Sequence, residues 1–433
     1  MNAAGELVLA SLYLAPTAER DELLRRAAGD LEDWSRALEA LEAHGFLGLA
    51  LRNLEGAGAS VPPAALERLR ERARAMLAID LAFRLTLERL LQATRGDGIE
   101  VTLLKGASLA VDLYPQHGLR TQADLDLLVR PGDVLRTVAA ARRIGLHPPP
   151  DALPAWWYRL VHFHLKLVPA DGLQREIELH WHLHPLAQLY TVKLAELLAR
   201  RRRIELGGHP AWTLDPLDRL LHLVTHLVRH CPLGMLDRET LRAWAADTRV
   251  PLRLKWVLDV RSEVELRHGE FPVGALAARA AEWNAEAELA LVLAWIDARL
   301  GFAGEARAWV ARVLAALPPA RSTASPAAPA RDRPLPGLDL RPSALLAFPR
   351  WVWPPASHFG RLSGNGPVPV ARRGLHAARV LGRAGLVVAA TPCAWLTRLA
   401  RSREQRPLGP EELLELSAHA RRMAQAEERS TSS

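Results

Sequence analysis

Apolar residues recur every three to four positions in two long stretches of the chain, a spacing that is typical of helices packed against a core. In the N-terminal stretch this pattern predicts helices at Asp21–Ala28, Leu31–His44 and Pro63–Thr94. In the second stretch, which ends near Leu317, Asp215-Pro216 is expected to start a helix, because proline fits the first helical position. The pattern therefore predicts two helical regions with a different kind of structure between them.

The segment between the helical regions reads as alternating strands and helices. Strands are expected at Gly98–Leu104, at Asp124–Val129, and in two runs, His162–Pro169 and Arg175–Leu183, joined by a turn. Helices are expected at Ala107–Tyr114 and Pro131–Ile144. We therefore expect an α+β fold, in which a small mixed sheet is flanked by N-terminal and C-terminal helical regions.

These patterns divide the chain into five parts. We expect an N-terminal helical region at 1–95, the α+β core at 96–185, a C-terminal helical domain at 186–317, a linker at 318–341 rich in Pro, Ala, Ser and Arg, and a basic tail at 342–433. Trp351 and Trp353 beside Arg350 allow two interpretations of the tail: contact with an anionic membrane surface, or a segment that packs its tryptophans on the helical domain. We favour the second.

Composition restricts the class of protein. Hydrophobic residues make up 49% and charged residues 24%, the balance of a globular domain, and there is no apolar run of transmembrane length or signal-peptide pattern. Two distant cysteines, Cys231 and Cys393, cannot build a disulfide framework, so a cytoplasmic protein is expected. The net charge of +8 comes almost wholly from arginine. We attribute it to compositional bias, since no basic stripe is interleaved with aromatic residues as a nucleic-acid partner would require.

Asp124 and Asp126 are two residues apart on a predicted strand, so their carboxylates project from the same face. Their mutual repulsion can be offset by a divalent cation such as Mg²⁺ or Mn²⁺, which prefers oxygen ligands. An acidic strand face without a metal is the alternative. A later strand carries alternating Glu176, Glu178, His180 and His182, and one of its carboxylates could complete a metal site; the remaining side chains could line the same cleft.

Lys105 and Gly106 stand at the predicted junction between the first strand and the following helix. A glycine there lets the backbone approach a phosphate, and the helix N-terminus offers free N–H groups to an anion. Lys105 and Arg120 are candidates for countering phosphate charge, although each could equally be a solvated or salt-bridged cation.

Several of these motifs together resemble a known family. Leu-Leu-Lys105-Gly106-Ala-Ser108, then Arg120-Thr121-x-x-Asp124-Leu-Asp126-Leu-Leu-Val, then Glu178-Leu-His180-Trp181 are similar to the bacterial uncharacterised nucleotidyltransferase family of the DNA polymerase β superfold. The likeness continues into the helical half through His222 and His226 and through Trp256-Val-Leu-Asp259, and covers about Leu85 to Leu317.

The resemblance implies roles for individual residues. Asp124 and Asp126 match the metal-binding pair, and Glu178 matches the third carboxylate, which deprotonates the attacking hydroxyl. Gly106 with Ser108 matches the positions that contact the triphosphate, and Lys105, Arg120 and Thr121 are the neighbouring phosphate-binding candidates. Ala107 departs from the superfamily pattern, in which a second small hydroxylic residue or glycine follows. The implied reaction is attack of an acceptor hydroxyl on the α-phosphate of an NTP, supported by Mg²⁺ or Mn²⁺.

Two classes of function stay open at this point, and a third possibility is the antitoxin-like or protein-modifying role that some members of the superfold play. The first is an enzyme that transfers a nucleoside monophosphate to a small-molecule, peptide or protein acceptor. The second is a catalytically silent module of the same fold that binds a nucleotide or a partner. His222, His226 and His230 recur every four residues and could bind zinc, but we expect them to pack against the sheet or to line the acceptor cleft. The NTP, the acceptor and the oligomeric state are not determined by the sequence.

Overall fold

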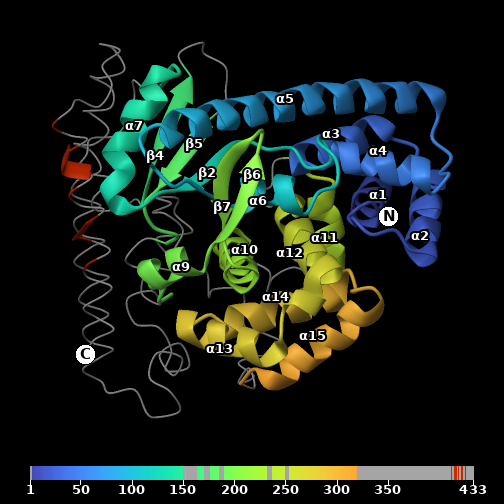
Figure 1. Cartoon of the computed structure of the whole chain (residues 1–433). Helices are drawn as coiled ribbons and strands as arrows, with labels where there is room; N and C mark the ends of the chain where they lie inside the picture. The colour runs from blue at the N-terminus through green and yellow to red at the C-terminus, as the bar shows by residue number, and fades with distance from the viewer. Residues whose placement is uncertain are drawn as a thin grey trace, which may run out of the picture.

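The computed structural model describes residues 2–149, 152, 163–169, 176–184, 190–231, 237–248 and 253–318, with several positions between 411 and 425. Within these residues, helices flank both faces of one mixed seven-stranded sheet (Figure 1). The expected α+β fold class is therefore confirmed. The turn predicted at 170–172, the linker at 318–341, and Trp351 and Trp353 lie outside the described residues.

The sheet contains both parallel and antiparallel neighbours. In spatial order its strands are β3 (Leu146–His147), β4 (His164–Pro169), β5 (Glu176–His180), β2 (Asp124–Leu128), β1 (Thr102–Leu103), β7 (His209–Thr213) and β6 (Arg202–Leu206). The pairs β2–β5 and β1–β7 are parallel, and the other neighbouring pairs are antiparallel. The strand carrying Asp124 is therefore a central strand, held on both sides by ladder hydrogen bonds.

The hairpin β6–β7 is a difference from the sequence-based expectation, which treated the chain after Pro185 as mainly helical. Gly207 and Gly208 both have positive φ, 58° and 77°, and form the two-residue turn that this hairpin requires. Because Trp212 of β7 pairs with Thr102 of β1, the sheet continues past the boundary drawn at residue 185. A Gly-Gly pair between two alternating runs was the available sequence signal.

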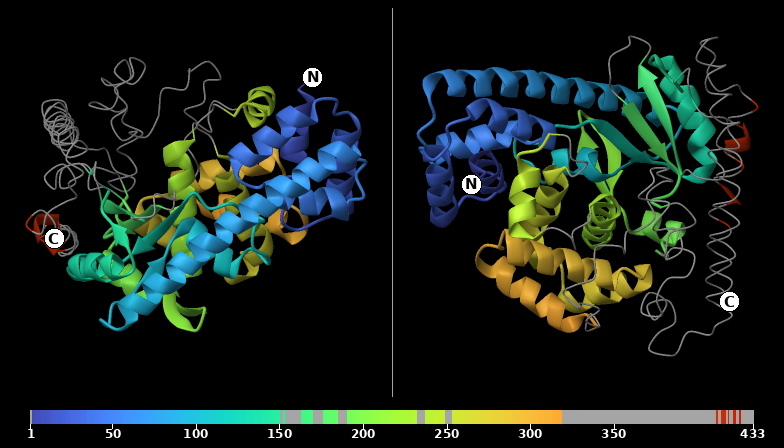
Figure 2. Two further views of the ribbon diagram at one scale, coloured as in Figure 1. Left: turned by 90° about the horizontal axis from the view of Figure 1, so that it is seen from above. Right: turned by 180° about the vertical axis from the view of Figure 1, so that it is seen from behind.

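One face of the sheet is apolar and is covered by two helices. Buried leucines at alternate positions of β2, including Leu125 and Leu127, share a hydrophobic cluster with residues of α5 (Pro63–Arg95) and α7 (Val134–Arg143). Figures 1 and 2 show α5 running along one side of the molecule, from the N-terminal helices to the sheet. Strand alternation sends Asp124, Asp126 and their neighbours to the opposite face, toward α6 (Lys105–Asp112) and α10 (Pro216–His230).

The two helical regions share one hydrophobic cluster, which contains residues from Ala4 to Leu317. The remaining N-terminal helices are α1 (Ala3–Ala10), α2 (Ala18–Gly29), α3 (Trp34–His44) and α4 (Leu47–Gly56). The later helices are α9 (Leu194–Arg200), α11 (Arg238–Ala245), α12 (Leu254–Arg267), α13 (Val273–Trp283), α14 (Glu286–Arg299) and α15 (Gly304–Ala316). The shared cluster means that the N-terminal helices pack against the C-terminal half.

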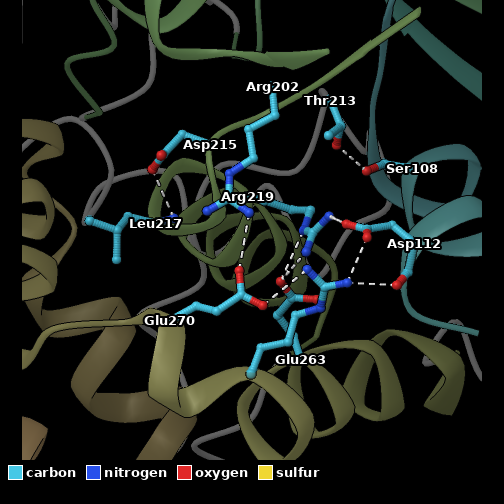
Figure 3. Close-up of polar contacts among 10 residues, drawn as sticks. Ser108, Asp112, Arg202, Thr213, Asp215, Leu217, Arg219, Glu263 and Glu270 are labelled. Carbon is cyan, nitrogen blue, oxygen red and sulfur yellow. Dashed lines mark hydrogen bonds and ion pairs between the residues drawn. The ribbon is translucent and has the colours of Figure 1, made fainter. Parts of the chain in front are cut away.

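A buried ion network connects α6, α10 and α12 below the sheet (Figure 3). Arg219 of α10 donates to Glu263 of α12 at 2.6 and 2.9 Å and also pairs with Asp112 at the end of α6. Arg267 completes the network with a 2.6 Å contact to Asp112. Because Arg219 and Glu263 are almost fully buried, each depends on the other for its charge to be compensated.

Two further observations concern the ends of the molecule and membranes. Leu416, in the expected tail, is fully buried within the same cluster as the apolar face of the sheet. Part of the tail therefore contributes to this core.

Among the described residues, every helix is too short or too polar to pass through a lipid bilayer.

Candidate active site

Three carboxylates meet on the polar face of the sheet because of the register of two strands. β2 and β5 run parallel, with Asp124 opposite Glu176 and Asp126 opposite Glu178. Side chains that are directly opposite in a sheet project from the same face and lie close together. The structure therefore brings Asp124, Asp126 and Glu178 into one group. Alternation predicted the faces within each strand, and the family resemblance implied that Glu178 joins the aspartate pair.

Lys105 reaches this group from the start of α6. Its Nζ lies 2.6 Å from Oδ1 of Asp126, and its backbone has φ of 42°, a left-handed conformation that non-glycine residues rarely adopt. The strained backbone lies at the junction between β1 and α6, where it directs the lysine toward the carboxylates. Lys105 thus places a positive charge in direct contact with Asp126.

Two histidines complete the group from neighbouring strands. His180 of β5 places its Nε2 2.9 Å from Oδ1 of Asp126 and 3.5 Å from Oε2 of Glu178. His164 of β4 is paired with His180 across the sheet, and its Nε2 is 3.6 Å from Oε1 of Glu178. His180 was an expected cleft residue, whereas His164 was not singled out as a site residue.

The charges in this group influence one another strongly. Burial raises the pKa of Asp124, and the neighbouring Asp126 raises it further. Burial also acts to raise the pKa of Asp126, but Lys105 and His180 outweigh it and hold that pKa well below the usual range. Burial acts in the same direction on Glu178, and contacts with His180 and His164 lower its pKa to about 2. Of the two aspartates, Asp124 is therefore the one whose ionised form is disfavoured, because Asp126 already carries a negative charge beside it.

A cleft opens over the carboxylates, and α10 forms its opposite wall. Asp124, Glu178 and Lys105 line one side. The other side is lined by His222, His226, Arg229 and His230 of α10 and by Trp256 of α12. The histidine spacing of four residues was the sequence signal for this wall. These histidines were expected to pack against the sheet or to line the acceptor cleft, and they line this cleft; that an acceptor binds there stays a prediction. Arg229 and Trp256 had no comparable signal.

The α10 wall consists of neutral imidazoles and one cation. Burial is the largest cause that lowers the pKa of His222 to about 3 and that of His230 to about 4, so both rings are neutral near pH 7. His222 is buried, and neither of its ring nitrogens has a hydrogen-bond partner within the described chain. Arg229 lies over the ring of Phe163 at 5.3 Å and forms no ion pair with the described residues. The wall therefore combines neutral rings with one cation, Arg229, that lines the cleft without an ion pair among the described residues.

Two of the expected phosphate-binding residues, Arg120 and Gly106, take part in packing. Arg120 donates to both oxygens of Asp259, each at 2.7 Å, so its charge is already compensated. A Cβ atom at Gly106 would lie 2.4 Å from Nη1 of Arg120, so the glycine is needed for the close approach of this guanidinium. The sequence interpretation had attributed that glycine to a phosphate.

The remaining expected residues lie at the edges of the group. Ser108 is fully buried and its hydroxyl lies 2.5 Å from that of Thr213 (Figure 3), and Ser108 does not line the cleft. Thr121 donates its N–H to the carbonyl of Gly45 at 2.9 Å. Glu176 pairs with Lys166 at 2.5 Å. Nδ1 of His182 accepts the backbone N–H of His184 at 3.1 Å, and His182 does not line the cleft.

Comparison with known proteins identifies the family of this chain. A family model described as an uncharacterised nucleotidyltransferase matches residues 30–301, which is more than half of the chain. The chain belongs to this nucleotidyltransferase family. The match begins earlier than the likeness recognised from the motifs, which began near Leu85, and so includes most of the N-terminal helices. No curated protein and no solved structure matches this nucleotidyltransferase-family chain.

The residues present fit the divalent cation that a nucleotidyltransferase would use. Asp124, Asp126 and Glu178 project from one face of the sheet, and Asp124 and Glu178 line the cleft. Carboxylate oxygens grouped in this way suit a hard cation. The raised pKa of Asp124 shows that burial and Asp126 disfavour its ionised form, and a bound cation would relieve this cost.

Proposed function

We propose that this chain is a metal-dependent nucleotidyltransferase, which transfers a nucleoside monophosphate from an NTP to a hydroxyl group of a small-molecule, peptide or protein acceptor. The observation that carries the proposal is the parallel register of β2 and β5, which places Asp126 opposite Glu178 with Asp124 on the same face. Membership of the nucleotidyltransferase family supports the same reaction class.

Asp124, Asp126 and Glu178 are assigned to holding the divalent cation, Mg²⁺ or Mn²⁺. A cation bound there would neutralise phosphate charge and polarise the α-phosphate. Lys105 is suited to contact the triphosphate, because it enters the cleft from a helix N-terminus beside Asp126. Arg229 takes the place that the sequence interpretation gave to Arg120, since Arg229 lines the cleft without an ion-pair partner among the described residues.

In the proposed reaction the acceptor oxygen forms a bond to the α-phosphorus while the bond to the bridging oxygen of pyrophosphate breaks. The hydroxyl proton passes to Glu178, the carboxylate that the family resemblance assigns to this step. Lys105 and Arg229 offset the charge that develops on the departing pyrophosphate.

The proposal is tested by thermal unfolding of the full chain with each NTP, in the presence and absence of Mg²⁺ or Mn²⁺. A ligand at a hundred times its Kd stabilises the native state by about 2.7 kcal/mol, which raises the Tm measurably. We expect a metal-dependent shift with at least one NTP, and loss of this shift in Asp124→Asn. Glu205→Gln, an exposed position on the same sheet, is the matched control and should keep the shift.

The outcomes separate the two open functions. If an NTP shifts the Tm, α-labelled nucleotide should become attached to an acceptor in a fractionated extract, with release of pyrophosphate. If an NTP shifts the Tm without any such transfer, the chain is a nucleotide-binding module. Absence of a shift with every NTP and both metals would contradict the proposal.

A further inference from the structure

A second set of metal-ligating side chains lies beside the aspartate pair. One ligand atom each from His164, Glu178 and His180 lies within 4.8 Å of the other two. The contacts to the Glu178 carboxylate are 3.6 Å from Nε2 of His164 and 3.5 Å from Nε2 of His180. Ligands at about 2.1 Å around a tetrahedral ion are separated by roughly 3.4 Å, and each histidine nitrogen lies near that distance from one oxygen of Glu178, Oε1 for His164 and Oε2 for His180.

The strands fix this arrangement. His164 and His180 are directly paired on antiparallel β4 and β5, with their ring centroids 4.9 Å apart. Glu178 is two residues before His180 on the same strand and so projects from the same face. Sites built on strands hold their ligands more precisely than sites on loops. All three residues line the cleft, so an ion and a substrate could reach them.

The ligand types differ from those that magnesium prefers. Mg²⁺ selects oxygen ligands in near-octahedral geometry, whereas imidazole nitrogens favour Zn²⁺ and other divalent transition metals. Oδ1 of Asp126 lies 2.9 Å from Nε2 of His180, but it is also 2.6 Å from Nζ of Lys105. Because Lys105 already binds this oxygen, we do not count Asp126 as a ligand, and three ligands remain: His164, Glu178 and His180. Three protein ligands leave an open coordination position, the usual arrangement of a catalytic site.

We propose that His164, Glu178 and His180 bind a divalent transition-metal ion, of the Zn²⁺ or Co²⁺ type, next to the Asp124–Asp126 pair. The inference deepens the proposed function, on which its role depends, by adding at one side of the cleft a second cation, which shares Glu178 with the Mg²⁺ or Mn²⁺ assigned to Asp124, Asp126 and Glu178. The binding itself is a property of the protein without nucleotide and is tested separately. The site has nitrogen ligands, so it discriminates strongly against Mg²⁺.

The experiment uses the full chain, freed of metal with a chelator and titrated with Co²⁺ in the absence of nucleotide. We expect one equivalent of Co²⁺ to produce a visible absorption band of the strength typical of a four- or five-coordinate site. One equivalent of Zn²⁺ should abolish the band, and about a hundredfold excess of Mg²⁺ should leave it in place.

Substitutions locate the ion. His164→Ala should remove the band and weaken Co²⁺ binding by more than about 100-fold, because loss of even an outer-shell partner costs 10- to 100-fold. His230→Ala, a histidine of the same cleft outside the cluster, is the matched control and should keep the band. Circular dichroism and the Tm of each metal-free variant show whether it is folded, and Glu178→Gln provides a second ligand variant that preserves side-chain size.

The possible failures are distinct. A wild-type chain without the visible band, a band that survives in His164→Ala, or displacement of Co²⁺ by equimolar Mg²⁺ would each overturn the inference. If the wild-type chain shows no band, the histidines only form hydrogen bonds or ion pairs with the carboxylates. Asp124→Asn should lose the NTP-dependent shift yet retain the Co²⁺ band, so failure of the proposed function and failure of the metal inference give different results.

Discussion

Arg120 and Asp259 form a buried bidentate pair, with Nε and Nη2 of the arginine each 2.7 Å from one carboxylate oxygen. The hydroxyl of Tyr114 donates to the same carboxylate at 2.8 Å. The pair joins the segment just before β2 to α12, so it helps to fix Asp124 relative to the helical half of the cleft. Gly106 leaves the space through which the guanidinium passes.

Gly106→Ala should therefore destabilise the fold. Its Cβ would lie 2.4 Å from Nη1 of Arg120, so the arginine or the start of α6 must move. We expect a loss of about 1–3 kcal/mol in the free energy of unfolding, the usual cost of overpacking. Urea unfolding measures it, with Gly132→Ala as the control, since no atom lies within 4 Å of a Cβ there. Equal unfolding midpoints for the two variants would show that the space around Gly106 is not restricted.

Arg219→Met should destabilise the protein more strongly. The substitution leaves the Glu263 carboxylate buried without its main partner, which typically costs about 3–5 kcal/mol. Arg202→Met is the matched control, because the Arg202–Glu270 pair, also drawn in Figure 3, has an arginine side chain that is 51% exposed. An exposed pair contributes about 0–1 kcal/mol. Chemical denaturation of both variants provides the comparison, and similar losses would contradict the structural role given to Arg219.

Arg229→Gln should weaken nucleotide binding while leaving the metal-free, ligand-free protein about as stable as before. Arg229 forms no described ion pair, so its removal exposes no buried carboxylate, and burial already lowers its pKa. Loss of one charge-assisted contact to phosphate corresponds to about a tenfold or greater rise in Kd. Isothermal titration with the NTP found by thermal unfolding measures this. Arg203→Gln on the exposed edge of β6 should bind normally, and an unchanged Kd in Arg229→Gln would remove Arg229 from the phosphate site.

Lys255 should make stability depend on pH in the alkaline range. Burial, with a smaller effect of Arg120, lowers the pKa of Lys255 from 10.5 to about 8. Between these values the unfolded chain binds more protons than the native chain, so stability rises with pH across that window. The rise contributed by Lys255 should vanish in Lys255→Met. Urea unfolding at pH 7.5 and pH 10 gives the change in the free energy of unfolding with pH for wild type and variant. Equal changes in the two proteins would contradict the lowered pKa.

Local sequence determined much of the fold and the centre of the candidate site. Period-two alternation in Asp124–Leu128 and Glu176–His180 fixes which side chains share a face whenever these segments are strands, because successive residues in a strand point to opposite sides. Likewise, the spacing of His222, His226 and His230 fixes one stripe of a helix. These relations depend only on the geometry of single elements, so they could be predicted without the fold.

Tertiary structure decided which elements meet and which polar groups are left for a ligand. Nothing local shows that β5 lies parallel to β2, that the hairpin β6–β7 extends the sheet beside β1, or that α10 faces the carboxylates. Tertiary structure is also the reason why the phosphate-binding role proposed for Arg120 from the sequence is now proposed for Arg229. Both are arginines in the sequence, but long-range packing gives Arg120 a buried partner in Asp259 and leaves Arg229 at the cleft without one among the described residues. A cation's role depends on its partner, and only the folded chain brings the partners together.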